Sequence, residues 1–89
     1  MAYLSKDLSV LAYANGFTLW HYATADDADT VDTAGYFNPA ADMLRAGDII
    51  IANLETAGTQ QAGLFFVRQA GSGSVDVADM TQIGDSNTD

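Results

Sequence analysis

Apolar and polar positions follow different periods along the chain, and one continuous aliphatic run has both a start and a stop signal. The run I-I-I-A is preceded by the turn-forming pair Gly47-Asp48 and followed by Asn53. β-branched side chains are stiff at χ1 and favour a pleated strand over a helix. The pattern therefore predicts a central strand over residues 48–52, with Ile50 buried in the core of the domain.

A β-hairpin is predicted over residues 8–24, because Asn15-Gly16 is the strongest two-residue signal for a type I′ turn. Pairing Ala14 with Phe17 decides which residues share a face of the hairpin. One face then holds Val10, Ala12, Leu19 and His21, and the other holds Leu11, Tyr13, Trp20 and Tyr22. Both faces are largely apolar, so we expect both to be covered. A helix of the same chain would cover one, and the rest of a barrel or another subunit would cover the other.

The period changes after the hairpin, where small apolar residues recur at helical spacing. We predict a helix that is capped by Thr24 and ended by Gly35. One of its faces carries Ala25, Ala28 and Val31. The acidic residues near its start suit the positive end of the helix dipole.

The second half of the chain contains one more helical signal and two more strand signals. A short turn of helix is predicted from Asn38, its cap, to Gly47, since Pro39 suits the first helical position. Leu64–Gln69 is predicted to return as the antiparallel partner of the central strand. Val75–Ala78 is predicted to form a half-exposed edge strand, because its apolar and polar residues alternate.

These elements indicate an α+β fold, a small antiparallel β-sheet or partly closed β-barrel with one or two short helices packed on it. Residues 1–7 are predicted to form an extended N-terminal arm. Residues 8–84 are predicted to form a single β-rich domain, and residues 85–89 a polar C-terminal tail. A chain of 89 residues is the size of one domain, and no internal repeat divides it.

Charge narrows the classes of partner. Three basic and twelve acidic residues give a net charge of -9, which repels phosphate groups, so we expect neither nucleic acid nor an anionic membrane as a partner. No apolar run approaches the ~20 residues that span a bilayer, and no secretory leader is expected. A hydrophobic content of 48% is high for so small and acidic a chain, and this surplus favours an interface with another subunit.

Candidate chemistry is sparse. Clustered carboxylates are what calcium prefers, but Asp26, Asp27, Asp29 and Asp32 do not have the spacing of a calcium loop, so a solvated helix start is favoured. Cysteine is absent and His21 is the only histidine, so no nucleophile and base can be paired. We therefore expect no enzyme, cofactor or metal site. The aromatic rings near His21 could stack on a sugar, although core or subunit packing is the more frequent role of such rings.

Two stretches of the sequence resemble a known family. The stretch A-Y-A-N-G-F-T-L-W-H-Y-A-T and the later stretch D-T-A-G-Y-F-N-P-A-A-D-M-L-R-A-G-D-I-I-I-A-N are similar to small structural proteins encoded by tailed bacteriophages and related gene transfer particles. The similarity covers roughly Ala12 to Val67. Its recurring pieces are Trp20-His21-Tyr22-Ala23-Thr24, the Gly35-Tyr36-Phe37 corner and the segment Leu44 to Asn53.

This resemblance implies a structural virion protein, either a capsid cement (decoration) protein or the capsid-attachment domain of a head fibre. Because no long shaft follows in the sequence, a stand-alone cement protein is expected, made in the bacterial host cytoplasm and located on the capsid exterior. Its expected partners are the major capsid protein and itself, as a homotrimer. The expected interface residues are Tyr3, Leu4, Leu11, Tyr13, Trp20 and Tyr22. The alternative is a small carbohydrate- or peptide-binding module.

Overall fold

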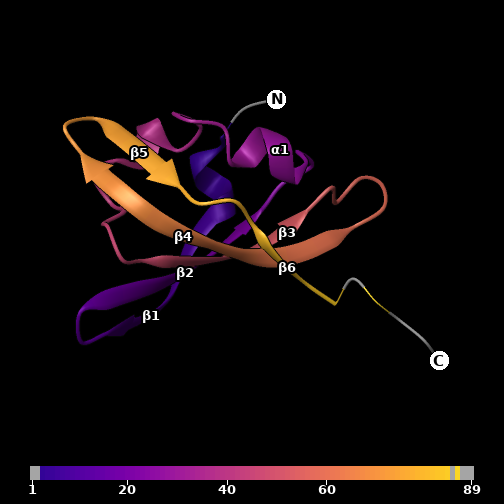
Figure 1. Cartoon of the computed structure of the whole chain (residues 1–89), viewed down its shortest axis with the longest axis horizontal. Coiled ribbons are helices and arrows are strands. Elements are labelled where there is room, and N and C mark those ends of the chain that lie inside the picture. The colour runs from indigo at the N-terminus through magenta and orange to yellow at the C-terminus, as the bar shows by residue number, and fades with distance from the viewer. Residues whose placement is uncertain (1–2, 85, 87–89) are drawn as a thin grey trace.

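The computed structural model describes residues 3–84 and 86, and within them the chain forms a mixed sheet of six strands with short helical turns on one side (Figure 1). The strand order is β1-β2-β3-β4-β5, and β6 pairs with β4 beside β5. The strands are β1 (Leu8–Ala14), β2 (Phe17–Ala23), β3 (Ile49–Leu54), β4 (Gln61–Gly71), β5 (Ser74–Val77) and β6 (Thr81–Ile83). The helical elements are α1 (Ala28–Val31) and the 3-10 turns η1 (Ser5–Asp7) and η2 (Asn38–Ala40). The broad prediction of a β-rich α+β fold is confirmed.

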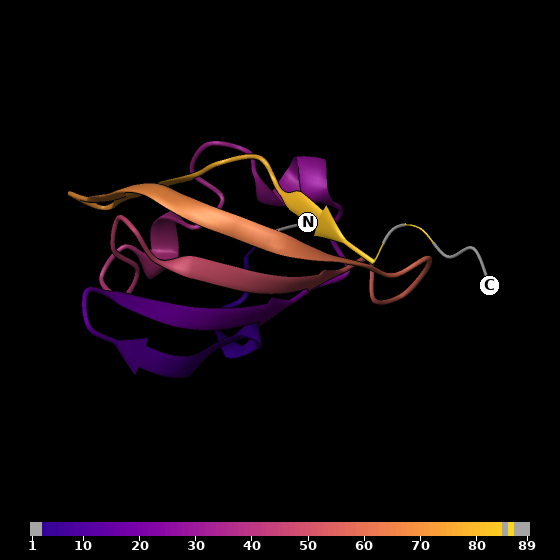
Figure 2. The ribbon, with the colours of Figure 1, turned by 60° about the horizontal axis from the view of Figure 1, so that its bottom comes forward.

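The predicted antiparallel sheet or partly closed barrel is wrong in two respects. β2 and β3 run parallel, with Leu19 opposite Ile49, and the sheet stays open, with β1 at one edge and β5 and β6 at the other. Parallel neighbours need a long crossover, which residues 24–48 supply. This crossover carries α1 and η2 to one side of the sheet, while Figure 2 shows β1 to β4 side by side in order. None of the described helices has the length or apolar character needed to cross a membrane.

The core lies between the crossover and the sheet. Burial alternates along β3, where Ile50, Ala52 and Leu54 are fully buried, so the predictions of a central strand and of a buried Ile50 are confirmed. The facing side chains of the crossover and the neighbouring strands that are almost completely buried include Tyr22, Val31, Phe37, Ala40, Leu44, Phe65 and Val67. The crossover therefore covers one side of the sheet. Because successive side chains of a strand point to opposite faces, only every second residue of each strand is buried there.

The hairpin of β1 and β2 is confirmed, with Ala14 opposite Phe17, but its register contains a bulge. The register shifts between Val10 and Ala12, so Val10 pairs with Trp20. Val10 therefore lies on the same face as Trp20, and not on the predicted face with Leu19 and His21. The predicted face of Val10 is therefore wrong, because a bulged residue reverses the alternation beyond it.

The turn of this hairpin also differs from the prediction. Gly16 has φ 100°, but Asn15 is not among the described residues with a positive φ. A type I′ turn needs a positive φ at both positions, whereas a positive φ at the second position alone is the pattern of a type II turn. Glycine is needed at Gly16 in either case.

Both predicted helix caps were misplaced. The Asp27 carboxylate accepts the Thr30 N–H (2.9 Å) and begins α1, whereas the Thr24 hydroxyl accepts the N–H of Asp26 (3.1 Å). Asn38 lies inside η2, and its side-chain oxygen accepts the N–H of Val75 (2.9 Å). Thr, Asp and Asn side chains can each accept a hydrogen bond from several nearby backbone N–H groups. The sequence alone therefore does not say which of them caps a helix.

The two predicted terminal segments are described in part. Residues 1–2 of the arm and residues 85 and 87–89 of the tail lie outside the described residues. Tyr3 packs into the core at 9% exposure, and the rest of the arm turns into η1. Near the C-terminal end, β6 pairs with β4 and places Gln82 opposite Gly63. The sequence pattern did not predict β6.

Candidate functional site

The side of the sheet that faces away from the crossover carries apolar side chains that are partly exposed to solvent. Strand alternation places Leu19, Ile49 and Phe66 in one row across β2, β3 and β4, because each lies opposite the next. His21, Ile51 and Leu64 form the next row. We call the surface made by these two rows the outer face. Its side chains are half-buried, except for Phe66, which is 49% exposed.

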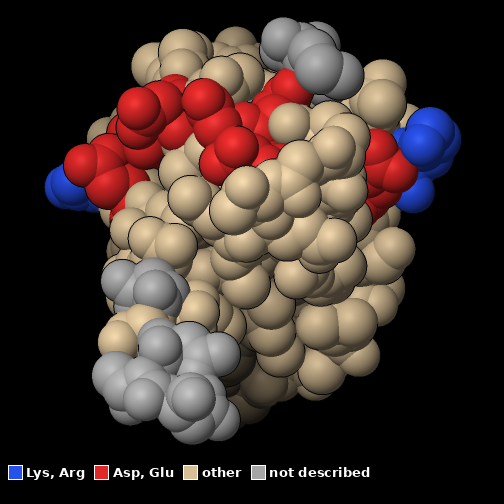
Figure 3. Space-filling model, turned by 90° about the vertical axis from the view of Figure 1, so that its right-hand side faces the viewer, with Lys and Arg blue, Asp and Glu red and all other residues tan. Residues whose placement is uncertain are grey.

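The outer face contains no carboxylate at any of its strand positions, although the protein carries a net charge of -9. Asp79, in the connection between β5 and β6, lies beside Phe66 at the rim. Figure 3 shows the acidic side chains of one flank gathered at the top, toward the α1 side of Figure 1, with an uncharged surface below them. The two rows of the outer face therefore carry no carboxylate, and Asp79 borders them.

One polar pair lies at the border of the outer face, where Asn53 follows Ile51 on the same side of β3. The His21 ring nitrogen Nε2 donates a hydrogen bond to the Asn53 side-chain oxygen (2.7 Å), linking β2 to β3. Pairing the two polar groups with each other reduces the cost of covering them with an apolar partner. The outer face can therefore be buried without leaving these two atoms unsatisfied.

A second apolar surface lies on the edge hairpin. In the edge strand β1, Val10 is 58% exposed, Leu11 55% and Tyr13 83%. No Asp, Glu, Lys or Arg occurs from Leu8 to Ala25. Natural edge strands usually carry charges or proline that prevent pairing with other chains, so this edge lacks the usual protection. We call Val10, Leu11 and Tyr13 the hairpin patch.

The structure divides the six interface residues predicted from the sequence. Leu4, Leu11 and Tyr13 are exposed, with Leu4 at 48%. The other three lie in the core, where Tyr22 stacks on Tyr3 with ring centroids 5.6 Å apart. Sequence reasoning predicted that the hairpin has a second apolar face, which includes Leu19 and His21, but it named no residue of the outer face as an interface residue. The consecutive isoleucines that predict β3 must also place apolar side chains on both sides of that strand.

Buried polar groups hold the core aromatic residues in place. The Trp20 indole N–H donates to the Asp48 carboxylate (3.0 Å). The Tyr36 hydroxyl donates to Asp26 (2.7 Å) and lies 2.8 Å from the Tyr22 hydroxyl. Burial, together with these hydrogen bonds to Tyr22 and Asp26, raises the pKa of Tyr36 well above its usual range. A sugar could not stack on Trp20 or Tyr22 unless the core opened.

The acidic residues considered as a calcium site have separate roles. Asp26 is buried and accepts the Tyr36 hydrogen bond, and hydrogen bonds from Thr30 lower the pKa of Asp27. Burial, and then repulsion by Asp79 and Asp29, raises the pKa of Asp32. Within the described residues, no three His, Cys, Asp or Glu side chains come together as metal ligands.

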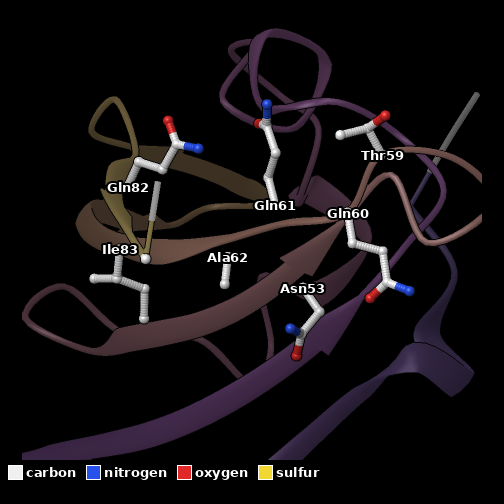
Figure 4. Close-up of a pocket in the computed structure, with 8 residues that line it drawn as sticks. Asn53, Thr59, Gln60, Gln61, Ala62, Gln82 and Ile83 are labelled. Atoms are coloured by element: carbon white, nitrogen blue, oxygen red, sulfur yellow. The ribbon is translucent and has the colours of Figure 1, made fainter. Parts of the chain in front are cut away.

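A hollow of about 620 Å³ is bordered by Asn53, Gln60, Gln61 and Gln82 at the start of β4. Figure 4 shows that these amides do not converge. Gln61 and Gln82 point to one side of the sheet, and Asn53 points to the other with Ile83. A ligand in this hollow would not be held by convergent polar groups, which are the usual mark of a small-molecule site.

Comparisons with known proteins give no match, whether with family models, with curated proteins or with solved structures. Function is therefore argued from the two apolar surfaces and from the resemblance carried by the sequence.

Proposed function

We propose that this protein is a structural virion protein that binds the outside of a bacteriophage capsid and stabilises it, associating with itself as a homotrimer. The observation that carries the proposal is the outer face, an apolar and carboxylate-free surface on a protein with a net charge of -9. Contiguous apolar surface of this kind marks contact with another macromolecule.

The expected energy of covering such a surface is large for a small domain. A contact of standard size buries ~800 Å² on each partner, of which a little under ~60% is apolar. At ~25 cal/mol per Å² this corresponds to about 12 kcal/mol of gross apolar transfer per partner, before the cost of association is subtracted. A domain whose own stability is about 5–10 kcal/mol would gain much of its resistance to unfolding from such a contact.

The charge distribution suits an external position on a particle. Carboxylates gather on the flank toward α1, where Asp27, Asp29 and Glu55 border one shallow hollow. If the outer face is covered, this flank remains in solvent, and like-charged particles then repel one another. A capsid accessory protein needs one surface that is covered on the particle and one that stays in solvent, and the outer face and this flank fit those two roles.

The assignment to a virion rests on the resemblance in the sequence. The three segments that carry it lie together in the fold: Trp20-His21-Tyr22-Ala23-Thr24 in and after β2, the Gly35-Tyr36-Phe37 corner in the crossover, and Leu44 to Asn53 leading into β3. Tyr22 and Phe37 pack with ring centroids 5.3 Å apart. The segments therefore determine the fold, and a head-fibre base with the same fold would use the same surfaces.

A carbohydrate- or peptide-binding module is the second candidate, and its site would be the hollow at the start of β4, whose amide side chains do not converge. It predicts that Gln82→Ala abolishes binding of a glycan or peptide and that Phe66→Glu does not. The virion proposal predicts the reverse dependence for binding to particles.

The experiment uses capsids assembled without this protein. Wild-type protein should co-sediment with them at saturable stoichiometry and raise their melting temperature. Phe66→Glu should lose most of this binding, because a charge in the outer face prevents that face from being covered, whether by the shell or by a neighbouring copy. Met43→Glu is the matched control, since Met43 is also exposed (44%) but lies in the crossover, and it should bind normally. Equal binding by both variants would contradict the proposal, as would no binding by the wild type.

A further inference from the structure

The outer face and the hairpin patch lie on opposite sides of the sheet. Val10 is opposite Trp20 and Tyr13 is opposite Thr18, so both point to the side that holds the core. They remain exposed because they lie beyond the part of the sheet that the crossover covers, whereas the outer face is on the reverse side. One molecule therefore presents two different apolar surfaces.

Charge identifies a second copy of the chain as a suitable occupant of both surfaces. Two copies with a net charge of -9 repel each other wherever their carboxylates approach. The stretch from Leu8 to Ala25 contains no Asp, Glu, Lys or Arg, and the outer face has no carboxylate at its strand positions. A contact between the hairpin patch and the outer face brings together two surfaces whose strand positions carry no carboxylate.

Each of the two surfaces has one exposed aromatic ring. Tyr13 at 83% exposure offers about 170 Å², taking about 200 Å² for a whole tyrosine. Phe66 at 49% exposure offers about 100 Å² on the same basis. These rings are the anchors of a contact that needs ~800 Å² per partner, which is about 15% of the molecular surface of 5442 Å².

We propose that copies associate head to tail, with the hairpin patch of one copy packed against the outer face of the next. A contact between two different surfaces is heterologous, and it produces a ring when the rotation between copies closes. This supplies the geometry that a homotrimer needs. Packing of the outer face against itself would instead give a twofold dimer.

The test uses one variant in each surface. Tyr13→Glu damages the hairpin patch and Phe66→Glu damages the outer face, with Met43→Glu as the matched control. Circular dichroism and thermal melting establish that each variant is folded, and Val10→Glu replaces Tyr13→Glu if the latter is not. Sedimentation velocity and native mass spectrometry then give the mass of each assembly against the 9.4 kDa protomer.

Wild type and Met43→Glu should form trimers, and each surface variant alone should be monomeric. An equimolar mixture of the two surface variants should form a one-to-one heterodimer, because the intact hairpin patch of the Phe66→Glu copy can occupy the intact outer face of the Tyr13→Glu copy. The complementary contact in that pair is damaged on both sides, so no ring closes. Formation of this heterodimer by two monomeric variants is a signature of head-to-tail contact.

Three results would overturn the inference. They are normal assembly by Tyr13→Glu, a mixture that stays monomeric at the highest soluble concentration, and a monomeric wild type. The inference rests on the proposed function for self-association, but the two fail separately. A wild-type protein that is monomeric but still binds capsids would contradict the head-to-tail contact and support the capsid role. A wild-type trimer that does not bind capsids would contradict the capsid role and support the head-to-tail contact.

Discussion

Replacing Asp48 with alanine should be among the most damaging single polar changes in this protein. The side chain is 2% exposed. Its carboxylate accepts the backbone N–H of Thr18 (2.9 Å), the indole N–H of Trp20 (3.0 Å) and the backbone N–H of Arg45 (3.1 Å). It therefore joins the start of β2, the core indole and the end of the crossover.

The cost follows from these three donors. A hydrogen bond to a charged group contributes about 1.5–3 kcal/mol, and removing a shared acceptor leaves each buried donor unsatisfied. Because the Thr18 and Arg45 groups are only partly buried, water can reach them, so the sum is reduced to about 3–5 kcal/mol. For a domain of this size, each 1 kcal/mol lowers Tm by about 4–8 °C. Asp48→Ala should therefore melt at least about 12 °C below the wild type.

The assay is urea and thermal unfolding followed by circular dichroism. Asp42→Ala is the control, because Asp42 is exposed and the substitution makes the same change in net charge. Asp48→Asn should be intermediate, since its amide keeps one acceptor oxygen but turns an NH₂ group toward the donors. If Asp48→Ala melts at the same temperature as Asp42→Ala, the carboxylate does not hold β2 and the crossover together.

Three further predictions concern local features of the fold. Gly16→Val should lower stability by about 1–2 kcal/mol, because φ is 100° there, and an unchanged urea midpoint would contradict this. Gly63→Ala should cost about 1–3 kcal/mol, because a Cβ would lie 2.7 Å from the Thr81 carbonyl oxygen; β6 amides that exchange hydrogen as slowly as in the wild type would refute it. Burial and the charge of Asp79 raise the pKa of Asp32 in the folded state. The ionised Asp32 therefore lowers the free energy of unfolding at pH values above this raised pKa, and it has no effect at pH values below the pKa of Asp32 in the unfolded chain. Asp32→Asn should therefore gain about 0.2–0.5 kcal/mol near pH 7 and nothing near pH 3, and an equal gain at both would contradict the reasoning.

Short-range patterns in the sequence correctly predicted the elements that depend on neighbouring residues alone. The isoleucine run with its flanking turns predicted β3, and Asn15-Gly16 predicted the hairpin. The parallel pairing of β2 with β3 was missed, because it depends on a long crossover that no local pattern encodes. β6 was missed for a similar reason, since it pairs where Gly63 allows close approach, and the need for glycine appears only after β6 is in place.

The candidate site shows the same division. Alternation placed Trp20 and Tyr22 on one face of the hairpin, but it could not say which face the crossover would cover. In the structure the crossover covers the face of Trp20 and Tyr22, so both are buried. The outer face was within reach of the sequence, since adjacent apolar residues such as Phe65 and Phe66 must point to opposite sides of a strand. The bulge between Val10 and Ala12, which places Val10 in the hairpin patch, had no signal in the residue pattern.

Cryo-electron microscopy of particles with and without this protein tests the central claim most directly. The account predicts additional density on the outside of the capsid shell, present only when the protein is supplied. Three copies should surround one axis, with each outer face covered and the carboxylate-bearing flank toward α1 in solvent. Particles whose outer surface is identical with and without the protein, or a bound copy whose outer face remains in solvent, would contradict it.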